Sequence, residues 1–248
     1  MGESTIDMAS TPLYREIQDR IVESLVSNEW RPGDILPSEK NLAKHFSVAT
    51  STVRRALSEL VDARVLVRIQ GKGTFVAHHN DSGSRYRFFN VVNAEGSKEP
   101  LQRTLISVKV EKAKAEALRL FDIPMAATRP EVYRIRFKLG CKDENFAVAE
   151  VILPRHLCSN LELEVSVDGE ESLYALYQAA FGINIVRVVE HMFAVKAPVM
   201  VARALGIEVD EPLLEIRRTA FTFHSVPVEQ RTTWIHTRHH HYLLSQGA

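Results

Sequence analysis

The chain has 248 residues, of which 45% are hydrophobic and 25% charged, and its formal net charge is zero. This composition excludes a disordered or fibrous protein, and the length favours two domains, since domains typically contain roughly 100–200 residues. No run approaches the roughly 18 apolar residues that span a bilayer, and the first ten residues lack the basic and apolar regions of a secretory signal. We therefore expect a cytoplasmic protein with no membrane partner.

The two cysteines, Cys141 and Cys158, are too far apart in sequence to indicate a redox or zinc-binding pair. No other cysteine is present to build a disulfide framework, so we expect both to be reduced.

Charge is unevenly distributed along the first third of the chain. Residues 1–39 contain three basic and eight acidic side chains, whereas residues 40–76 contain seven basic and two acidic ones, so the local net charge changes from −5 to +5. A segment polarised in this way can present a cationic face to phosphates. The alternative is that the two runs pair with each other on a solvated surface.

Three short helices are predicted within these residues. Apolar spacing from Leu13 to Leu25 predicts the first, which ends at the Arg-Pro-Gly of residues 31–33. Ser38 is a suitable N-cap for a second helix of about two turns, and a third begins near Thr50. The third helix buries Val53, Ala56, Leu57 and Leu60, and its opposite face has Ser51, Arg54, Arg55 and Ser58. Hydroxyls and arginines at a helix N-terminus suit entry into a DNA major groove.

A β-hairpin is predicted after the third helix. Two β-rich runs, residues 65–69 and 74–76, flank the turn Gln70-Gly71-Lys72-Gly73, whose glycines tolerate positive φ. With Lys72 at its tip, the hairpin can lie along a phosphate strand or enter a minor groove. The Gly-Lys-Gly-Thr run lacks the spacing of a phosphate-binding loop, so nucleotide binding is not expected.

Four segments of this region, in order, resemble the DNA-binding domain of GntR-type regulators. They are PLYREIQDRI, WRPGDILPSE, VATSTVRRALSEL and VRIQGKGTFV. The resemblance implies a winged helix-turn-helix that contacts operator DNA through Lys40, Thr50, Ser51, Thr52, Arg54, Gln70 and Gly71. The exposed helical face and the hairpin tip add Arg55 and Lys72 to this set. Lys40 and Thr50 stand where the family usually has arginine, which removes a planar guanidinium from both positions.

Residues 78–85 are small and polar and lack periodicity, which is typical of a linker. We therefore place a DNA-binding domain at residues 1–77 and a second domain at residues 86–248. His78 and His79 in the linker are interpreted as solvated side chains. Beyond residue 86 strands alternate with short helices, which predicts an α+β domain.

The second domain contains an internal repeat. A helix at 115–121 and strands at 132–139 and 147–153 are followed by a helix at 199–205 and strands at 213–221 and 228–236. Pro130 matches Pro212 at an offset of 82 residues, and Glu150 matches Glu229 at an offset of 79. We interpret this repeat as two halves that bury their apolar faces against each other, with a cleft between them.

Strand alternation places Arg134 and Arg136 together on the face opposite their apolar neighbours. Two adjacent guanidinium groups repel each other, so they need a shared anion or nearby carboxylates, and Glu150 on the next strand can supply one. Two interpretations stay open: an anion-binding site and an ion-paired sheet surface.

Residues from about 101 to 243 resemble the UTRA effector-binding domain of the HutC subfamily, whose fold is similar to chorismate lyase. The segments that resemble it are PEVYRIRF, AEVILP, ESLYALYQAAFGINIVRVVE, ARALGIEVDEPLLEIRRTAF and VPVEQRTTWIHTRHHHYL. The resemblance implies an antiparallel sheet with helices. It also implies effector contacts from Arg134, Arg136, Glu150, Ser172, Tyr174 and Glu229.

The two arginines, with Ser172 at a helix N-terminus, suit a phosphate or carboxylate, so a small anionic effector is expected. The sequence departs from the family at Ala149, where a glutamate is usual and Glu150 follows one place later. It also departs at Ile235 and His236, where tyrosine is frequent.

Four histidines lie near the C-terminus, at positions 236 and 239–241. Three consecutive histidines on a strand cannot all face one ion, and no cysteine or aspartate accompanies them in the sequence. No metal site is therefore predicted.

Together these features predict a sequence-specific transcription regulator, in the simplest case a repressor. It would bind double-stranded operator DNA as a homodimer, and a small anionic metabolite in the C-terminal domain would control its affinity. One alternative is a constitutive DNA-binding protein whose second domain only dimerises. The other is a lyase-like enzyme. The sequence lacks the HExxH and GxSxG motifs and a recognisable nucleophile with a base, which argues against this alternative. No catalytic residue and no cofactor are expected.

Overall fold

The computed structural model describes residues 12–27, 29–63, 65–77, 89–124, 129–141, 144–161, 168–169 and 172–244. The chain separates into two compact units, Met1–His78 and His79–Ala248, which are described separately below. The linker predicted at residues 78–85 lies outside the described residues.

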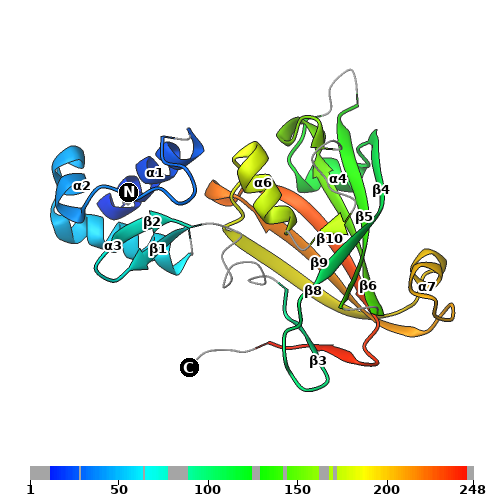
Figure 1. The fold of residues 1–248 in the computed structure, drawn as a ribbon. Helices are drawn as coiled ribbons and strands as arrows, with labels where there is room; N and C mark the ends of the chain where they lie inside the picture. The colour runs from blue at the N-terminus through cyan, green and yellow to red at the C-terminus, as the bar shows by residue number, and fades with distance from the viewer. Residues whose placement is uncertain are drawn as a thin grey trace, which may run out of the picture. The chain divides into compact units, whose positions relative to one another are not determined.

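The described residues of the first unit form three helices followed by a hairpin. Its elements are α1 (Leu13–Val26), α2 (Glu39–Phe46), α3 (Thr50–Asp62), β1 (Leu66–Ile69) and β2 (Gly73–Val76). The Ser38 side chain accepts a hydrogen bond from the Asn41 backbone N–H at 3.3 Å, so it caps α2 as predicted. The buried face of α3 consists of Val53, Ala56, Leu57 and Leu60. The predicted winged helix-turn-helix is thus confirmed (Figure 1).

Strands β1 and β2 form the wing of this domain. They pair antiparallel, beginning with Leu66 opposite Val76. Gly71 in the turn has a φ of +74°, a left-handed conformation that glycine adopts at little cost. The tight turn leaves Gln70 and Lys72 exposed at the tip of the hairpin.

The second unit is built on a seven-stranded antiparallel sheet with the order β7-β4-β5-β6-β10-β9-β8. Its strands are β4 (Gln102–Lys112), β5 (Glu131–Cys141), β6 (Glu144–Pro154), β7 (Asp168–Gly169), β8 (Arg187–Lys196), β9 (Pro212–Phe221) and β10 (Pro227–Ile235). A separate pair consists of β3 (Val91–Asn93) and β11 (His240–Tyr242). The helices are α4 (Ala115–Leu120), α6 (Leu173–Phe181) and α7 (Val199–Leu205), with short 3₁₀ turns at Arg155–Leu157 and Phe223–Ser225. This antiparallel α+β architecture is the one predicted.

The internal repeat appears as two similar halves, β4–α4–β5–β6 and β8–α7–β9–β10. They do not bury their apolar faces against each other, as the sequence interpretation had it. The halves instead meet edge to edge, because β6 and β10 pair as neighbouring strands, with Ala147 opposite Ile235. Glu150 lies opposite Thr232, and its side chain points to the opposite face of the sheet from that of Glu229. The proposed correspondence of Glu150 with Glu229 was therefore wrong, because the two side chains lie on different faces.

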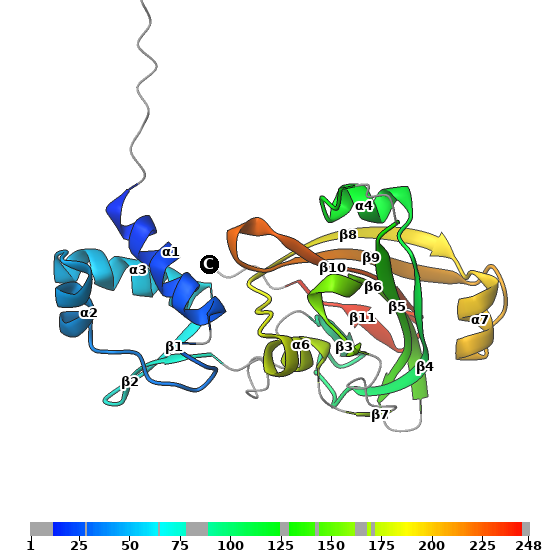
Figure 2. The ribbon, with the colours of Figure 1, turned by 90° about the horizontal axis from the view of Figure 1, so that it is seen from above.

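The two faces of the sheet have different coverings. Tyr133, Ile135 and Phe137 point to one face, where they pack into the main core with side chains of α6. On the opposite face Val132 packs against α4 and Val148 packs against α7. Helix α6 thus covers one face, while α4 and α7 cover the ends of the other (Figure 2). Away from the register shifts at Leu105/Ser107, Leu139/Gly140 and Pro227/Glu229, strand parity therefore places a polar side chain in one of two distinct environments.

Candidate functional sites

An ion-paired cluster joins the start of α2, helix α3 and the wing. Arg54 donates from Nε to Glu39 Oε2 at 2.9 Å, and Arg68 donates to Glu39 Oε1 at 3.1 Å. The Arg54 side chain remains 62% exposed, so this bond adds little stability and mainly orients the guanidinium. The sequence analysis missed Glu39, although its place directly after the N-cap Ser38 fixes it at the start of α2.

Arg55 has a different environment from Arg54. Its guanidinium lies 3.9 Å from the centre of the Tyr14 ring of α1, and its Nε is 3.5 Å from Glu59 Oε1. The cation–π contact links α3 to α1. The role of Arg55 in DNA contact therefore stays a prediction.

The remaining predicted DNA contacts are all at least partly exposed. They are Lys40 at the start of α2, Thr50, Ser51 and Thr52 in the first turn of α3, and Gln70, Gly71 and Lys72 in the turn of the wing. None of them is needed to fill the core of this unit, which leaves their side chains available to a ligand as large as DNA.

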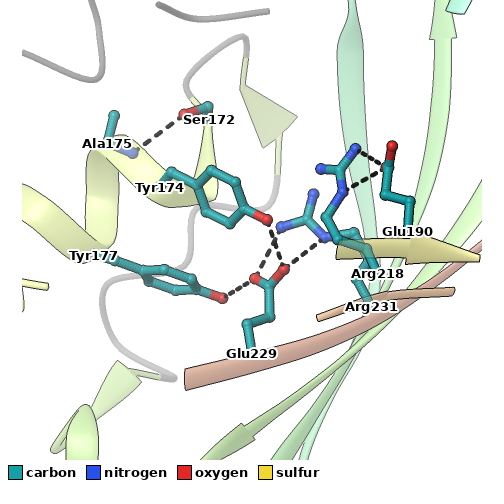
Figure 3. Close-up of polar contacts among 8 residues, drawn as sticks. All are labelled: Ser172, Tyr174, Ala175, Tyr177, Glu190, Arg218, Glu229 and Arg231. Carbon is teal, nitrogen blue, oxygen red and sulfur yellow. Dashed lines mark hydrogen bonds and ion pairs between the residues drawn. The ribbon is translucent and has the colours of Figure 1, made fainter. Parts of the chain in front are cut away.

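A group of polar side chains lies between α6 and the sheet, and we refer to it as the α6 cluster. It consists of Tyr174, Tyr177, Glu190, Arg218, Glu229 and Arg231 (Figure 3). The tyrosines belong to α6, and the charged residues belong to β8, β9 and β10. The register places Arg218 opposite both Glu190 and Arg231 on neighbouring strands, which brings two guanidinium groups and two carboxylates to one face.

Glu229 is the centre of the α6 cluster and is completely buried. Arg231 donates to both of its carboxylate oxygens, at 3.0 Å and 2.9 Å. Tyr174 and Tyr177 donate their hydroxyl protons to the same carboxylate, at 3.1 Å and 2.8 Å. Burial and the negative charge of Glu229 raise the pKa of both tyrosines, so their hydroxyls remain donors at neutral pH.

The second ion pair of the α6 cluster joins Arg218 and Glu190. Arg218 donates from Nε to Glu190 Oε1 at 2.8 Å, and only 8% of its side chain is exposed. Tyr242 of β11 donates its hydroxyl to the other oxygen of Glu190. Burying charged groups is costly even when they are paired, so a concentration of this kind is typical of a ligand site.

Ser172 lies at the N-terminus of α6, where the sequence placed it. Its side-chain oxygen accepts a hydrogen bond from the Ala175 backbone N–H at 3.1 Å, so the serine is the N-cap of the helix (Figure 3). Tyr174 and Glu229, two further predicted effector contacts, lie in the α6 cluster. Tyr177, Arg218 and Arg231 were missed. Helical spacing places Tyr177 beside Tyr174, and alternation along β10 places Arg231 on the face of Glu229, so these two had a local signal. Arg218 is brought to them only by the strand register.

Arg134, Arg136 and Glu150 lie on the opposite face of the sheet. Arg134 bonds to Glu111 and Glu150, and Arg136 donates from Nε to Glu150 Oε2 at 2.6 Å. The bond from Arg134 lowers the pKa of Glu111. This face is thus ion-paired, and the structure does not bring the six predicted effector residues together. The role of these three residues in effector binding stays a prediction.

A hollow of about 420 Å³ adjoins Arg134, between α4 and the central strands. Its charged lining consists of Glu111, Glu116, Glu150, Glu215, Lys114, Arg134 and Arg217. Carboxylates outnumber basic groups by four to three, so an anionic ligand gains no net attraction there.

The one-residue shift between Ala149 and Glu150 decides which face a carboxylate occupies. Ala149 is buried in the core beside the α6 tyrosines, whereas Glu150 points to the opposite face. Glu150 therefore does not replace the glutamate that the family usually has at position 149, since successive strand residues face opposite sides.

Two residues that are distant in sequence lie near the histidine run. Cys141 and Glu99 lie beside His240. No cysteine is close to the histidines in the sequence, but Cys141 is close to His240 in the folded chain. The other histidines of the run, His239 and His241, are exposed.

An exposed recognition helix and a basic wing, followed by a sheet domain with a buried polar cluster, define a DNA-binding transcription regulator. Comparisons with known families agree. The model for bacterial regulatory proteins of the gntR family matches residues 13–76, and the UTRA domain model matches residues 99–241. The chain belongs to the GntR family of regulators with a UTRA domain, which confirms the family resemblance seen in the sequence.

Individual relatives are also transcription regulators. The mannosyl-D-glycerate transport/metabolism system repressor MngR of Escherichia coli K12 is 29% identical over 215 residues, which cover 84% of this chain and 85% of that protein. The histidine utilization repressor of Klebsiella aerogenes is 46% identical over 69 residues, or 28% of this chain and 29% of that protein.

The second unit also resembles a solved structure. The ligand-binding domain of a protein assigned to the GntR family from Bordetella bronchiseptica superposes with a TM-score of 0.59 and 27% identity, covering 66% of this chain and 99% of that chain. Among the described residues, no helix is both long and apolar enough to cross a bilayer.

Proposed function

We propose that this protein is a cytoplasmic, homodimeric repressor whose affinity for operator DNA changes when a small anionic metabolite occupies the α6 cluster. The role is regulatory rather than catalytic. One winged helix reads only a short half-site, so two copies related by symmetry are needed for useful specificity. Helix α3 would enter the major groove, with Arg54 oriented by Glu39, and the wing would contact the backbone with Lys72.

The observation that supports effector control most strongly is the α6 cluster itself. A sheet face that only had to be buried under α6 would be more stable with apolar side chains than with two ion pairs. A ligand can exchange with these pairs, because Arg218 and Arg231 suit a phosphate or carboxylate, while Glu190 and Glu229 can accept hydrogen bonds from hydroxyl or ammonium groups. We therefore expect an anion that also has hydroxyl or amino groups.

The test combines ligand binding and operator binding. Fragments of the organism's genome that bind the purified protein supply an operator, and sugar phosphates, amino acids and small carboxylates are screened by thermal shift. A ligand that raises Tm should change the operator Kd by about 5- to 150-fold, as expected for a coupling of 1–3 kcal/mol. Tyr174→Phe keeps the ring but removes a donor to Glu229, and it should weaken ligand binding.

The comparison variant is Arg134→Ala, on the opposite face. An effector in the α6 cluster predicts an unchanged ligand response in this variant, whereas the effector contact expected of Arg134 from the sequence predicts its loss. Loss of the response in Arg134→Ala but not in Tyr174→Phe would place the effector on the other face of the sheet. A ligand that binds without any change in operator affinity would support the alternative in which the second domain only dimerises.

A further inference from the structure

Three potential metal ligands from distant parts of the sequence meet in the second unit. Glu99 precedes β4, Cys141 is the last residue of β5, and His240 is the first residue of β11. One ligand atom from each residue, a carboxylate oxygen, the Sγ atom and an imidazole nitrogen, lies within 4.8 Å of the other two. These residues are separate from the α6 cluster and from the predicted DNA contacts.

His240 is the residue that points most directly to a ligand. Its exposed fraction is 7%, and neither of its ring nitrogens has a hydrogen-bond partner among the described residues. A buried imidazole without such partners forfeits the hydrogen bonds that it makes with water in the unfolded chain. The Phe146 ring stacks on it, with 3.8 Å between ring centres, and so fixes its plane.

The position of His240 suits a metal ion. Its Nε2 atom lies 3.8 Å from Glu99 Oε2. Nitrogen and oxygen ligands of a tetrahedral zinc ion are about 3.3 Å apart, given zinc–ligand distances of about 2.0–2.1 Å. A side-chain movement of about half an ångström therefore closes this pair on an ion.

The three residues open onto a hollow of about 500 Å³, which Glu144 and His239 also line. The hollow gives a metal ion a route to solvent and room for a fourth ligand, either water or one of these two side chains. Thiolate, imidazole and carboxylate together are a ligand set that suits zinc, whereas magnesium and calcium prefer oxygen alone.

We propose that Glu99, Cys141 and His240 form a zinc-binding site in the UTRA domain. On binding, the Cys141 thiol loses its proton to solvent and its thiolate forms a bond to Zn²⁺, while the neutral His240 nitrogen and the Glu99 carboxylate donate electron pairs. No oxidation or reduction is involved. The ion links the segment after β3, the end of β5 and the start of β11, so zinc binding should stabilise this part of the fold.

The first experiment measures binding to the full-length protein after removal of metals with a chelator. Zinc titrated against a competing chelator should bind one equivalent per chain and raise Tm. Cys141→Ser and His240→Gln should each weaken this binding by more than about 100-fold, since even changes outside the ligand set cost about 10- to 100-fold. The matched controls are Cys158→Ala, the other cysteine, and His241→Ala, the exposed neighbour on β11, which should both bind as wild type.

The second experiment does not require substitution of a ligand. Cobalt(II) added to metal-free Cys158→Ala, in which Cys141 is the only cysteine left, should produce a thiolate-to-cobalt charge-transfer band and intense tetrahedral d–d bands. Absence of the charge-transfer band would overturn the proposal. Zinc binding of equal affinity in wild type, Cys141→Ser and His240→Gln would also overturn it, because the ion would then be held by the exposed histidines.

Discussion

The ion pair between Arg231 and Glu229 can be tested for its cost to stability by neutralising one partner and then both. Arg231→Met leaves the Glu229 carboxylate buried with only two tyrosine hydroxyls as donors. Removing one partner of a buried pair typically costs about 3–5 kcal/mol. For a unit of this size, 1 kcal/mol corresponds to about 2–4 °C, so Tm should fall by roughly 6–20 °C.

The double variant Glu229→Gln/Arg231→Met removes both charges and keeps an amide oxygen for the tyrosine hydroxyls. It should recover most of the stability lost in Arg231→Met, because an uncharged pair of similar volume carries no penalty for an unpaired buried charge. The same double variant should have lost the ligand response, since both the guanidinium and the carboxylate are gone.

Urea unfolding followed by fluorescence measures these changes in the second unit alone. The protein has two tryptophans, Trp30 in the first unit and Trp234 in the second, so a Trp30→Phe background reports only the second. The control is the single variant Glu229→Gln. If the loss of unfolding free energy in the double variant equalled the sum of the losses in Arg231→Met and Glu229→Gln, the pair would not be coupled and the reasoning about its cost would be refuted.

Further predictions concern DNA contacts and pH. Arg54→Ala should weaken operator binding by about 1–3 kcal/mol, or roughly 5- to 150-fold, while Tm stays unchanged. Fluorescence anisotropy of labelled operator DNA measures the binding, and Arg20→Ala, which replaces an exposed arginine on α1, is the control. Lys72→Ala should reduce the slope of log K against log salt by about one without changing sequence preference, and an unchanged slope would argue against a phosphate contact. The pKa values of Tyr174 and Tyr177 are raised in the fold, so above pH 10 both keep protons that they lose in the unfolded chain. The free energy of unfolding should therefore fall by up to about 1.4 kcal/mol per pH unit for each tyrosine. This decrease with pH should be shallower in Tyr174→Phe. If the free energy of unfolding measured in urea fell equally steeply with pH in that variant, the raised pKa of Tyr174 would be contradicted.

The first unit could be predicted almost completely from the sequence, because its signals are local. The N-cap Ser38 and the glycine turn at Gly71 act within a few residues of where they stand. The exposed side chains of α3 follow directly from helical periodicity. The bond from Glu39 to Arg54 was missed because it joins two helices, and their relative position is not encoded in either pattern.

In the second unit the strands and their parity could be predicted, but their pairing could not. Alternation correctly separated Arg134 and Arg136 from their apolar neighbours. The pairing of β6 with β10, which joins the two halves of the sheet, connects residues about 80 apart in the chain, and nothing local specifies it. The cluster of Cys141 with His240 arises in the same way, across 99 residues of sequence.

Both faces of the sheet contain arginine–glutamate pairs, so parity alone cannot choose the effector site. Our proposal of the face under α6 rests on the charges that surround each set of pairs. The face with Arg134 opens onto a hollow with more carboxylates than basic groups, so an anion placed there gains no net attraction. Under α6 the two arginines are matched by two carboxylates, and the tyrosine hydroxyls are further donors. An incoming anion that replaces Glu229 or Glu190 as the partner of a guanidinium leaves that carboxylate unpaired, so the ligand must also bring an ammonium or hydroxyl group to it. A ligand that exchanges partners in this way would change the hydrogen bonds that join α6 to β10 and the ion pair that joins β8 to β9, and this gives a small molecule a physical means of altering the packing of the domain.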